Sequence, residues 1–363
     1  MNARDTLARI QALPAPLRPI RVLNVCGGHE RSITELGLRS LLPDWVQLIP
    51  GPGCPVCVCP EEAIHQAIQM ALLHPLTLVA FGDMLRVPVN LNKGEANSLA
   101  AARAQGADIR PIASPLEVIA LARSLAPRPL VFFVAGFETT LAPVAAMLAE
   151  ADLPANLFLQ LAGRRTWPAV EFLLQAGSSF EAMIAPGHVA AIMGANEWRF
   201  VAEKYALPVA VAGFAADTLL TGLHAVLRHA LRHEAALDNA YPAVVKADGN
   251  PQAQALLAKA FDIVDAPWRG IGSIPASGYR LTSLHAARDA SLQFPVAISG
   301  HKRSGQMPAG CDCAAVLLAH KRPSECRLYG RACTPESPIG PCMVSDEGAC
   351  HIWWRAGERV ATA

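Results

Sequence analysis

The sequence predicts an α/β protein with two related parallel-sheet α/β domains and a smaller C-terminal domain organised by cysteines. Two observations support this fold class. Short apolar runs alternate with longer amphipathic runs through the first two-thirds of the chain, and the composition shifts toward glycine, proline and cysteine after residue 235. Because 363 residues are enough for two or three hydrophobic cores, we expect domains over residues 1–130, 131–235 and 236–363.

Several apolar runs have the length and continuity of buried strands. They cover residues 20–25, 45–49, 76–81, 129–136, 180–185 and 207–214. Residues 30–42, 60–73 and 114–125 lie between them and have the apolar spacing of helices. Near-continuous apolar strands that alternate with helices are typical of parallel sheets covered on both faces.

The charge balance excludes some classes of partner. Lys and Arg number 31 and Asp and Glu number 30, so the chain lacks the basic excess of proteins that bind nucleic acid or anionic membranes. No run of about 18 uncharged apolar residues occurs, and residues 1–19 carry charges throughout, unlike a signal peptide. We expect a soluble cytoplasmic protein with neither a nucleic-acid nor a membrane partner.

The ten cysteines fall into two groups at opposite ends of the chain. The first group is Cys26, Cys54, Cys57 and Cys59, and the second is Cys311, Cys313, Cys326, Cys333, Cys342 and Cys350. In a large chain without a secretory signal, such grouping indicates metal or redox chemistry rather than a disulfide scaffold.

The second group has the spacing C-x14-C-x6-C-x16-C through Cys311, Cys326, Cys333 and Cys350. Four thiolates are what a [4Fe–4S] cluster requires, whereas structural zinc more often uses tight C-x2-4-C pairs, which are missing here. The other readings are zinc and a set of buried free thiols. Cys313 and Cys342 are left over, and Cys313 is able to take the place of Cys311.

The first group contains a C-x-x-C pair, Cys54 and Cys57, after a turn rich in proline and glycine. This spacing suits a disulfide or a shared metal, although incidental thiols in a proline-rich loop are the simpler explanation. Cys26 ends a predicted strand in "CGGHE", where the following helix would favour its thiolate. His29 is close enough to be a second ligand or proton carrier, while a plain strand-to-helix turn is the alternative.

Two further turns follow predicted strands. "GFETT" places Glu138 at the start of a helix, and "APGHV" places His188 after another strand. Because ligands of parallel α/β sheets bind at the carboxyl ends of the strands, the Glu138 turn and the Cys26 turn are expected to line one cleft. The structural alternatives are a favourable helix N-terminal charge for Glu138 and a core or capping role for His188.

Taken together, these motifs resemble the HypD family of hydrogenase maturation factors. The resemblance runs from about residue 20 to residue 355. It is carried by "CGGHE", "PGPGCPVC", "GDMLRVP", "GADIRPIASPLE", "GFETT", "APGHV", "VAGF", "WRGIGSIPASGYRL" and "CTPESPIGPCMVSDEGAC", with the C-terminal cysteine spacing in register.

The resemblance implies a fold of two related α/β domains and a third that carries a [4Fe–4S] cluster. It also implies an iron–sulfur scaffold on which the Fe(CN)2CO unit of [NiFe]-hydrogenase is assembled with the small chaperone HypC. Cyanide would come from HypE, working with HypF, and the hydrogenase large subunit would receive the unit. Such a protein is a redox-active assembly scaffold rather than an enzyme with ordinary turnover.

Residue roles follow from the same resemblance. Cys26 would bind the iron of the transient Fe(CN)2CO unit, with His29 as a nearby essential group. Cys54 and Cys57 would be the redox-active pair. The cluster would be held by Cys311, Cys326, Cys333 and Cys350.

Three features depart from the family pattern. Cys59 adds a third thiol to "CPVCVC", Asp346 stands where serine is expected, and "GFETTLAP" is one residue longer than the usual form. The alternative function, from another class, is a stand-alone thiol–disulfide oxidoreductase that uses the cluster and the C-x-x-C dithiol.

Overall fold

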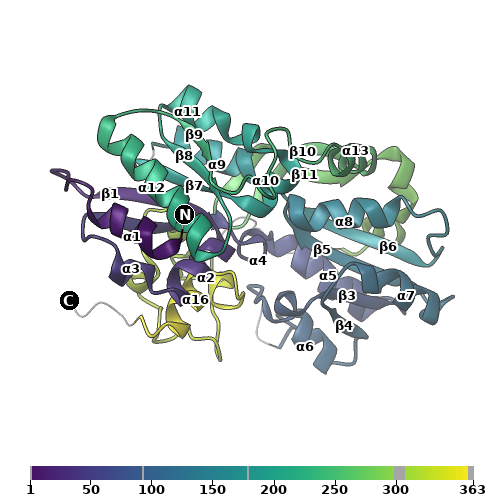
Figure 1. The fold of residues 1–363 in the computed structure, drawn as a ribbon. Coiled ribbons are helices and arrows are strands. Elements are labelled where there is room, and N and C mark those ends of the chain that lie inside the picture. The colour runs from purple at the N-terminus through teal and green to yellow at the C-terminus, as the bar shows by residue number, and fades with distance from the viewer. Residues whose placement is uncertain (1, 92–93, 178–179, 298–306, 359–363) are drawn as a thin grey trace.

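The fold contains two parallel sheets side by side, with the C-terminal residues packed beneath one of them (Figure 1). The computed structural model describes residues 2–91, 94–177, 180–297 and 307–358. The first sheet has the strand order β2-β1-β7-β8-β9 and the second has the order β4-β3-β5-β6. Every pairing within these two sheets is parallel.

The strands of the first sheet come from two distant parts of the chain. They are β1 (Ile20–Cys26), β2 (Val46–Gly53), β7 (Ala182–Pro186), β8 (Val209–Ala212) and β9 (Leu237–Asn239). The second sheet contains β3 (Thr77–Phe81), β4 (Ile109–Ile112), β5 (Leu130–Gly136) and β6 (Leu157–Gly163). Sheet membership therefore cuts across the expected boundary at residue 130, because the chain leaves the first sheet after β2 and returns at β7.

Helices cover both faces of the first sheet. On one face lie α1 (Ala3–Gln11) and α12 (Ala216–Arg232), and on the other lie α9 (Thr166–Gln175), α10 (Gly187–Met193) and α11 (Arg199–Tyr205). Alternate residues of β1 serve the two faces: Val22 packs toward α1 and α12, whereas Leu23 packs toward α9 and α10. After β1 and β2 come α2 (Gly27–Glu35), α3 (Leu38–Leu41) and α4 (Pro55–Val58).

The second sheet is covered in the same way. One face packs on α5 (Glu61–Leu73) and α6 (Leu99–Ala104), and the other on α7 (Leu116–Leu125), α8 (Glu138–Leu148) and α13 (Pro251–Ala260). The α/β class and the similar architecture of the two units are confirmed, since both sheets begin at an inner strand and grow in both directions.

The C-terminal third contains more strand than the sequence predicts. An antiparallel hairpin, β10 (Phe261–Trp268) and β11 (Gly272–Leu281), precedes α14 (Ala290–Gln293), α15 (Cys313–Leu317) and α16 (Ala349–Arg355). Between α15 and α16 the chain has little regular structure beyond the short 3-10 turns η4 (Pro323–Glu325) and η5 (Pro341–Met343). Its cysteines share a hydrophobic cluster with α4 and α5.

No helix in the described ranges is both long and apolar enough to cross a membrane.

Candidate functional site

A cleft of about 350 Å³ opens where the two sheets face each other. In an open parallel sheet, ligands bind at the carboxyl ends of the strands, at the point where the strand order reverses. In the first sheet this point lies between β1 and β7, and in the second between β3 and β5. Cys26, Pro186, Phe81 and Phe137 mark the ends of these four strands, and all four line the cleft. The cleft therefore joins the expected binding positions of both sheets.

Three strand-end turns meet in this cleft, and the sequence predicts two of them, those that follow β1 and β5. Cys26 comes from the first turn, Thr139 and Thr140 from the second and His188 from the third. Glu138 and His29 do not line it, because both side chains are fully buried.

The Cys26 thiol receives two backbone N–H groups at the start of α2, from His29 and Gly28. Both N–H groups lower the pKa of the thiol, as expected at a helix N-terminus, but they are not the largest influence on it. Burial, followed by the negative charge of Glu347, raises the pKa of Cys26 to about 12. Desolvation outweighs the two N–H groups, so the free thiol holds its proton at neutral pH.

His29 lies behind the cleft wall. Its Nε2 is 3.1 Å from the carbonyl oxygen of Ala212 and 3.2 Å from that of Gly213, which fixes Nε2 as the donor. Burial lowers the pKa of His29 to about 4, so the ring is neutral. It stacks on Phe214, and His188 packs against the same ring. The Nδ1 atom has no hydrogen-bond partner among the described residues.

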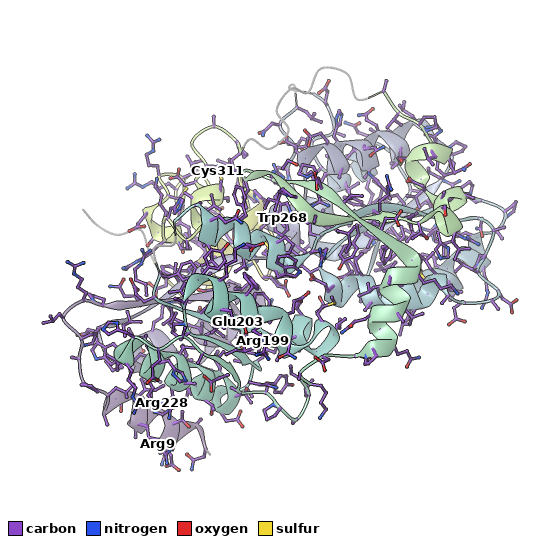
Figure 2. The ribbon with its side chains drawn as sticks, turned by 90° about the horizontal axis from the view of Figure 1, so that it is seen from above. Arg9, Arg199, Glu203, Arg228, Trp268 and Cys311 are labelled. Carbon is purple, nitrogen blue, oxygen red and sulfur yellow. A yellow bond between two sulfur atoms is a disulfide. The ribbon has the colours of Figure 1, made fainter. Side chains whose placement is uncertain are left out.

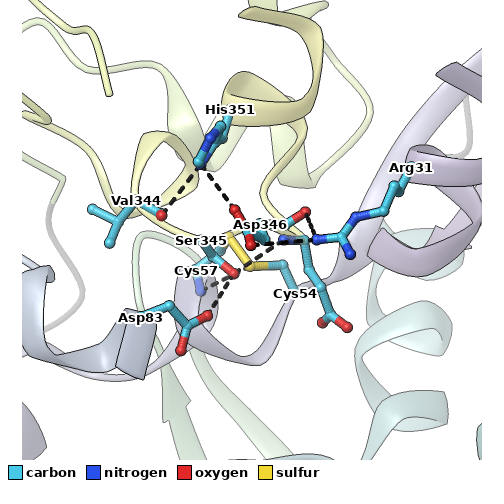
Figure 3. The surroundings of a disulfide bond; sticks show 9 residues. Arg31, Cys54, Cys57, Asp83, Val344, Ser345, Asp346 and His351 are labelled. Atoms are coloured by element: carbon cyan, nitrogen blue, oxygen red, sulfur yellow. Dashed lines mark hydrogen bonds and ion pairs between the residues drawn. A yellow bond between two sulfur atoms is a disulfide. The ribbon is translucent and has the colours of Figure 1, made fainter. Parts of the chain in front are cut away.

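Cys54 and Cys57 form a disulfide at the start of α4 (Figure 3). Cys54 is the N-cap residue, and its sulfur accepts the backbone N–H of Cys57 at 3.2 Å. Both cysteines are buried. Asp83 and Ser345 lie beside the disulfide in Figure 3 and are joined by a hydrogen bond of 2.9 Å. The pair is thus covered by the loop that precedes α16.

The Glu138 carboxylate points into the protein and not into the cleft. It accepts the backbone N–H of Thr166 at 2.8 Å and the Thr166 hydroxyl at 2.6 Å, and Thr166 itself lines the cleft. Burial raises the pKa of Glu138. Burial and the charge of Glu138 also raise the pKa of Glu197 to about 8. Glu138 therefore positions a cleft residue rather than touching the contents of the cleft.

The C-terminal thiols gather around Gly340. A Cβ on Gly340 would stand 2.5 Å from the sulfurs of both Cys311 and Cys313. The Cys313 thiol also interacts with those of Cys342 and Cys350, and contact with Cys311 is the largest reason that its pKa is raised well above the usual value. Contact with Cys313 likewise raises the pKa of Cys342, whereas it lowers the pKa of Cys311.

Cys333 and Cys326 complete the group. The Cys333 sulfur accepts the backbone N–H of Ile339 at 3.4 Å and also interacts with the thiols of Cys311 and Cys326. Backbone N–H groups that point at cysteine sulfur, and a glycine that leaves room between sulfurs, suit an iron–sulfur cluster. In the described ranges, no three Cys, His, Asp or Glu side chains form a ready site for a single metal ion.

Two carboxylates of the cleft were missed by the sequence reasoning. Asp83 follows β3 in "GDMLRVP", and Glu347 lies in the loop before α16. Burial raises the pKa of both, and for Glu347 the charges of Asp83 and Asp346 add to this effect. The position of Asp83 directly after a strand was the available signal. No sequence signal pointed to Glu347, because the loop that carries it has no strand or helix pattern.

Glu30, the last residue of "CGGHE", was also missed. Its buried carboxylate accepts hydrogen bonds from Asn24, Arg39 and Trp353. Trp353 belongs to α16, which also carries Cys350, and the Arg39 guanidinium lies over the Trp353 ring. Glu30 therefore joins the turn that holds Cys26 to the helix that holds a C-terminal thiol.

The fold and the site define a class of protein: a two-sheet α/β protein with one cysteine open to a central cleft, a buried disulfide beside it and a larger thiol group behind. Residues 1–357 match the family HypD, described as "Hydrogenase formation hypA family". The chain belongs to this family, and its role is in hydrogenase maturation.

Curated relatives agree over nearly the whole chain. The hydrogenase maturation factor HypD of Rhodobacter capsulatus is 38% identical over 365 residues, covering 98% of this chain and 95% of the relative. HypD2 of Bradyrhizobium diazoefficiens is 36% identical, with 96% and 92% covered, and HypD of Escherichia coli K12 is 35% identical, with 95% and 91% covered.

Proposed function

We propose that this chain is the iron–sulfur scaffold on which the Fe(CN)2CO unit of [NiFe]-hydrogenase is assembled before its transfer to the large subunit. It would act with a HypC-type chaperone and receive cyanide from HypE, which works with HypF. The observation that carries the proposal is the position of Cys26, which brings a sulfur ligand to the point where the binding edges of both sheets meet. The site would lie in the cytoplasm.

In this proposal Cys26 holds the substrate iron. Its thiol must lose a proton to bind iron as thiolate, because the pKa of Cys26 is raised to about 12 in the free chain. Glu347 is the neighbouring carboxylate whose charge acts on this thiol, and its raised pKa suits it to take up that proton. His29 keeps the α2 turn in place through its contacts with the carbonyl groups of Ala212 and Gly213.

The proposed resident cofactor is a [4Fe–4S] cluster on Cys311, Cys326, Cys333 and Cys350. When bound, it supplies electrons one at a time. Reduction of the Cys54–Cys57 disulfide takes two electrons and two protons and yields two thiols. The 3-10 turn η5, which carries Cys342, packs directly on α4, which carries Cys57, so the disulfide lies between the thiol group and the cleft.

The burial of the disulfide opposes the alternative function. A stand-alone thiol–disulfide oxidoreductase needs at least one sulfur that an external disulfide can reach. Cys54 is 2% exposed and Cys57 is 0% exposed. We therefore expect no turnover of a small disulfide by the chain alone, and a scaffold whose electrons reach the pair from inside the protein.

Infrared spectroscopy of the chain co-purified anaerobically with its HypC-type partner tests the proposal. Bands of cyanide and CO bound to iron are expected in the wild-type complex. Cys26→Ala should remove these bands and leave the visible absorption of the cluster unchanged. Cys59→Ala is the matched control, since Cys59 is also a thiol whose pKa burial raises to about 12 but does not line the cleft.

Two results would contradict the proposal. If Cys26→Ala keeps the bands, the iron is not held at this cleft. If the wild-type chain turns over a small disulfide repeatedly without a partner, the oxidoreductase function is the better description.

A further inference from the structure

The tip of the β10–β11 hairpin carries a buried arginine with unused hydrogen-bonding capacity. Arg269 follows β10 directly and is 0% exposed. Its backbone N–H donates to the carbonyl oxygen of Val58 at 3.0 Å, which anchors the hairpin tip on α4. The tip thus contacts the segment that carries the Cys54–Cys57 disulfide.

Only one end of the Arg269 guanidinium is occupied. Its Nη2 donates to the carbonyl oxygen of Pro88 at 2.8 Å and lies 3.7 Å from Oε2 of Glu61. Its Nε and Nη1 atoms are buried and have no partner among the described residues. Buried donors in proteins are nearly always paired, so two such atoms on one guanidinium indicate a missing acceptor.

Arg164 is a second buried arginine, which follows β6 and contacts the same hairpin, and its hydrogen bonds differ from those of Arg269. Arg164 directs Nε and Nη2 to the carbonyl oxygen of Pro267 and Nη1 to that of Gly163. Its three nitrogens are satisfied by protein oxygens, whereas those of Arg269 are not. Burial alone does not therefore explain the free atoms of Arg269.

The neighbours of the hairpin tip show where the missing acceptor lies. Gly270 has a positive φ of +76°. A Cβ there would stand 2.9 Å from Cβ of Ala314, the residue that follows Cys313 in helix α15. Trp268, the residue before Arg269, belongs to the same hydrophobic cluster as Cys313, and Cys311 packs against that cluster (both Trp268 and Cys311 are labelled in Figure 2). The hairpin tip that carries Arg269 therefore packs beside the C-terminal thiols.

We propose that Arg269 is the counter-charge of the proposed cluster, and that its Nε–H and Nη1–H would donate hydrogen bonds to the sulfur of that cluster or of the cysteines that hold it. The inference rests on the proposed function, because it needs a cluster at these thiols. Arg269 would be a positioning and tuning residue that touches the cofactor's sulfur and makes no contact with substrate iron.

The expected consequence is a higher reduction potential. A reduced cluster carries one more negative charge than the oxidised cluster, and a nearby guanidinium with N–H···S hydrogen bonds stabilises that extra charge. Lysine keeps the charge but lacks the planar set of donors, so it should restore only part of the effect.

Cys59 is the competing acceptor. Arg269 and Arg164 both act on its thiol, yet burial still raises the pKa of Cys59 to about 12. A neutral thiol is a weak acceptor. If the Arg269 guanidinium donated its hydrogen bonds to the Cys59 sulfur, removal of that sulfur would shift the reduction potential of the cluster as much as removal of the guanidinium.

The test compares Arg269→Met, Arg269→Lys, Cys59→Ala and Arg331→Met in the full-length chain with an anaerobically reconstituted cluster. Arg331 is an exposed arginine of the same cysteine-rich segment and is the matched control. Iron and sulfide content are measured first, and the potential is then titrated by electron paramagnetic resonance.

Arg269→Met should lower the ratio of reduced to oxidised cluster at a fixed potential about tenfold, which is about 59 mV for one electron. Arg269→Lys should lie between Met and wild type, and the other two variants should equal wild type. An unchanged potential in Arg269→Met overturns the inference, as does an equal shift in Cys59→Ala.

Two further outcomes remain decisive. If Arg269→Met does not fold, an unchanged potential in Arg269→Lys overturns the hydrogen-bonding role, since Lys has no Nε–H. If the wild-type chain itself holds neither iron nor sulfide, the proposed cofactor fails, and this inference fails with it for that separate reason.

Discussion

The two cysteine regions of this protein are built on different principles. Cys26 and Cys54 each end a strand and cap the helix that follows, so the first sheet and its helices fix their positions. The six C-terminal cysteines lie on loops, short helical turns and the start of α16, and Gly340 lies beside the sulfurs of Cys311 and Cys313. The first arrangement is complete without metal. The second has thiols that contact one another and that little regular structure holds in place.

The two regions also differ in how accessible their cysteines are to a partner. Cys26 is the one described cysteine that lines the cleft, whereas the disulfide and most C-terminal cysteines are buried. A partner can reach the Cys26 sulfur through the cleft, whereas the sulfurs of Cys54 and Cys57 are shielded from it. Any coupling between the two cysteine regions must therefore pass through the protein. Substitutions at the residues that join the regions can test this coupling.

Gly340→Ala is expected to have the largest effect, and only on the second region. The new Cβ would stand 2.5 Å from two sulfurs, too close for either to stay in place. We expect about a tenfold or greater loss of iron and sulfide after reconstitution, with the far-UV circular dichroism of the two sheets unchanged.

Gly82→Ala is the control, since a Cβ there meets nothing within 4 Å. If Gly340→Ala binds iron and sulfide as wild type does, the cysteines do not gather around this glycine when metal is bound.

Glu30→Gln should break the buried connection between the regions. The carboxylate accepts from Asn24, Arg39 and Trp353, and the amide of glutamine would turn a donor toward these donors. Removing one partner of a buried ion pair costs about 3 kcal/mol or more. Urea unfolding should show this loss, whereas Glu35→Gln, on the same helix, should change stability little. A loss below about 1 kcal/mol would mean that the connection is unimportant.

Much of the first region could be predicted from the sequence, because local rules determine it. Inner strands such as β1 and β5 are continuous apolar runs, and cysteine after a strand has a known place at a sheet edge. The edge strands β4, β6 and β9 were missed. β4 and β9 are short and partly polar, whereas β6 is a seven-residue, mainly apolar strand that the sequence reasoning overlooked. The return of the chain to the first sheet at β7 depends on long-range pairing, which no local pattern encodes.

For the second region, the sequence predicted which residues form the site but not the structure around them. Its cysteine spacing indicated a shared site, but the hairpin β10–β11 has mixed exposure and no apolar run, so neither it nor Arg269 was expected at the thiols. Glu138 was assigned to the cleft because it follows a strand. Its actual partner is Thr166, at the start of a different helix, which the sequence order does not reveal.

The pH dependence of stability should report on the first region through His29. Burial lowers the pKa of His29 from 6.5 to about 4, so the unfolded chain binds more protons than the folded chain between these values. Stability contributed by neutral His29 is present above pH 6.5 and is lost as the pH falls toward 4. At pH 5 the loss is about 2 kcal/mol.

Urea unfolding at pH 7 and pH 5 measures this effect. His29→Gln should reduce the difference between the two pH values by about 2 kcal/mol, and the exposed His320→Gln should leave it as in wild type. An unchanged difference in His29→Gln would mean that another group causes the acid sensitivity.

Asp346→Ser should have the smallest effect, although Asp346 also joins helix α2 to the C-terminal segment. Its carboxylate lies 3.7 Å from Nη2 of Arg31 and 4.0 Å from Nη1 of Arg355, and its side chain is 61% exposed. Exposed pairs contribute less than about 1 kcal/mol and are screened by salt. The Arg31 hydrogen bond to the backbone oxygen of residue 346, at 2.8 Å, survives the substitution. Urea unfolding at low and high salt should therefore show a small loss that disappears at high salt. A loss as large as that of Glu30→Gln, or one independent of salt, would show that the exposed contact and not the buried one holds the two regions together.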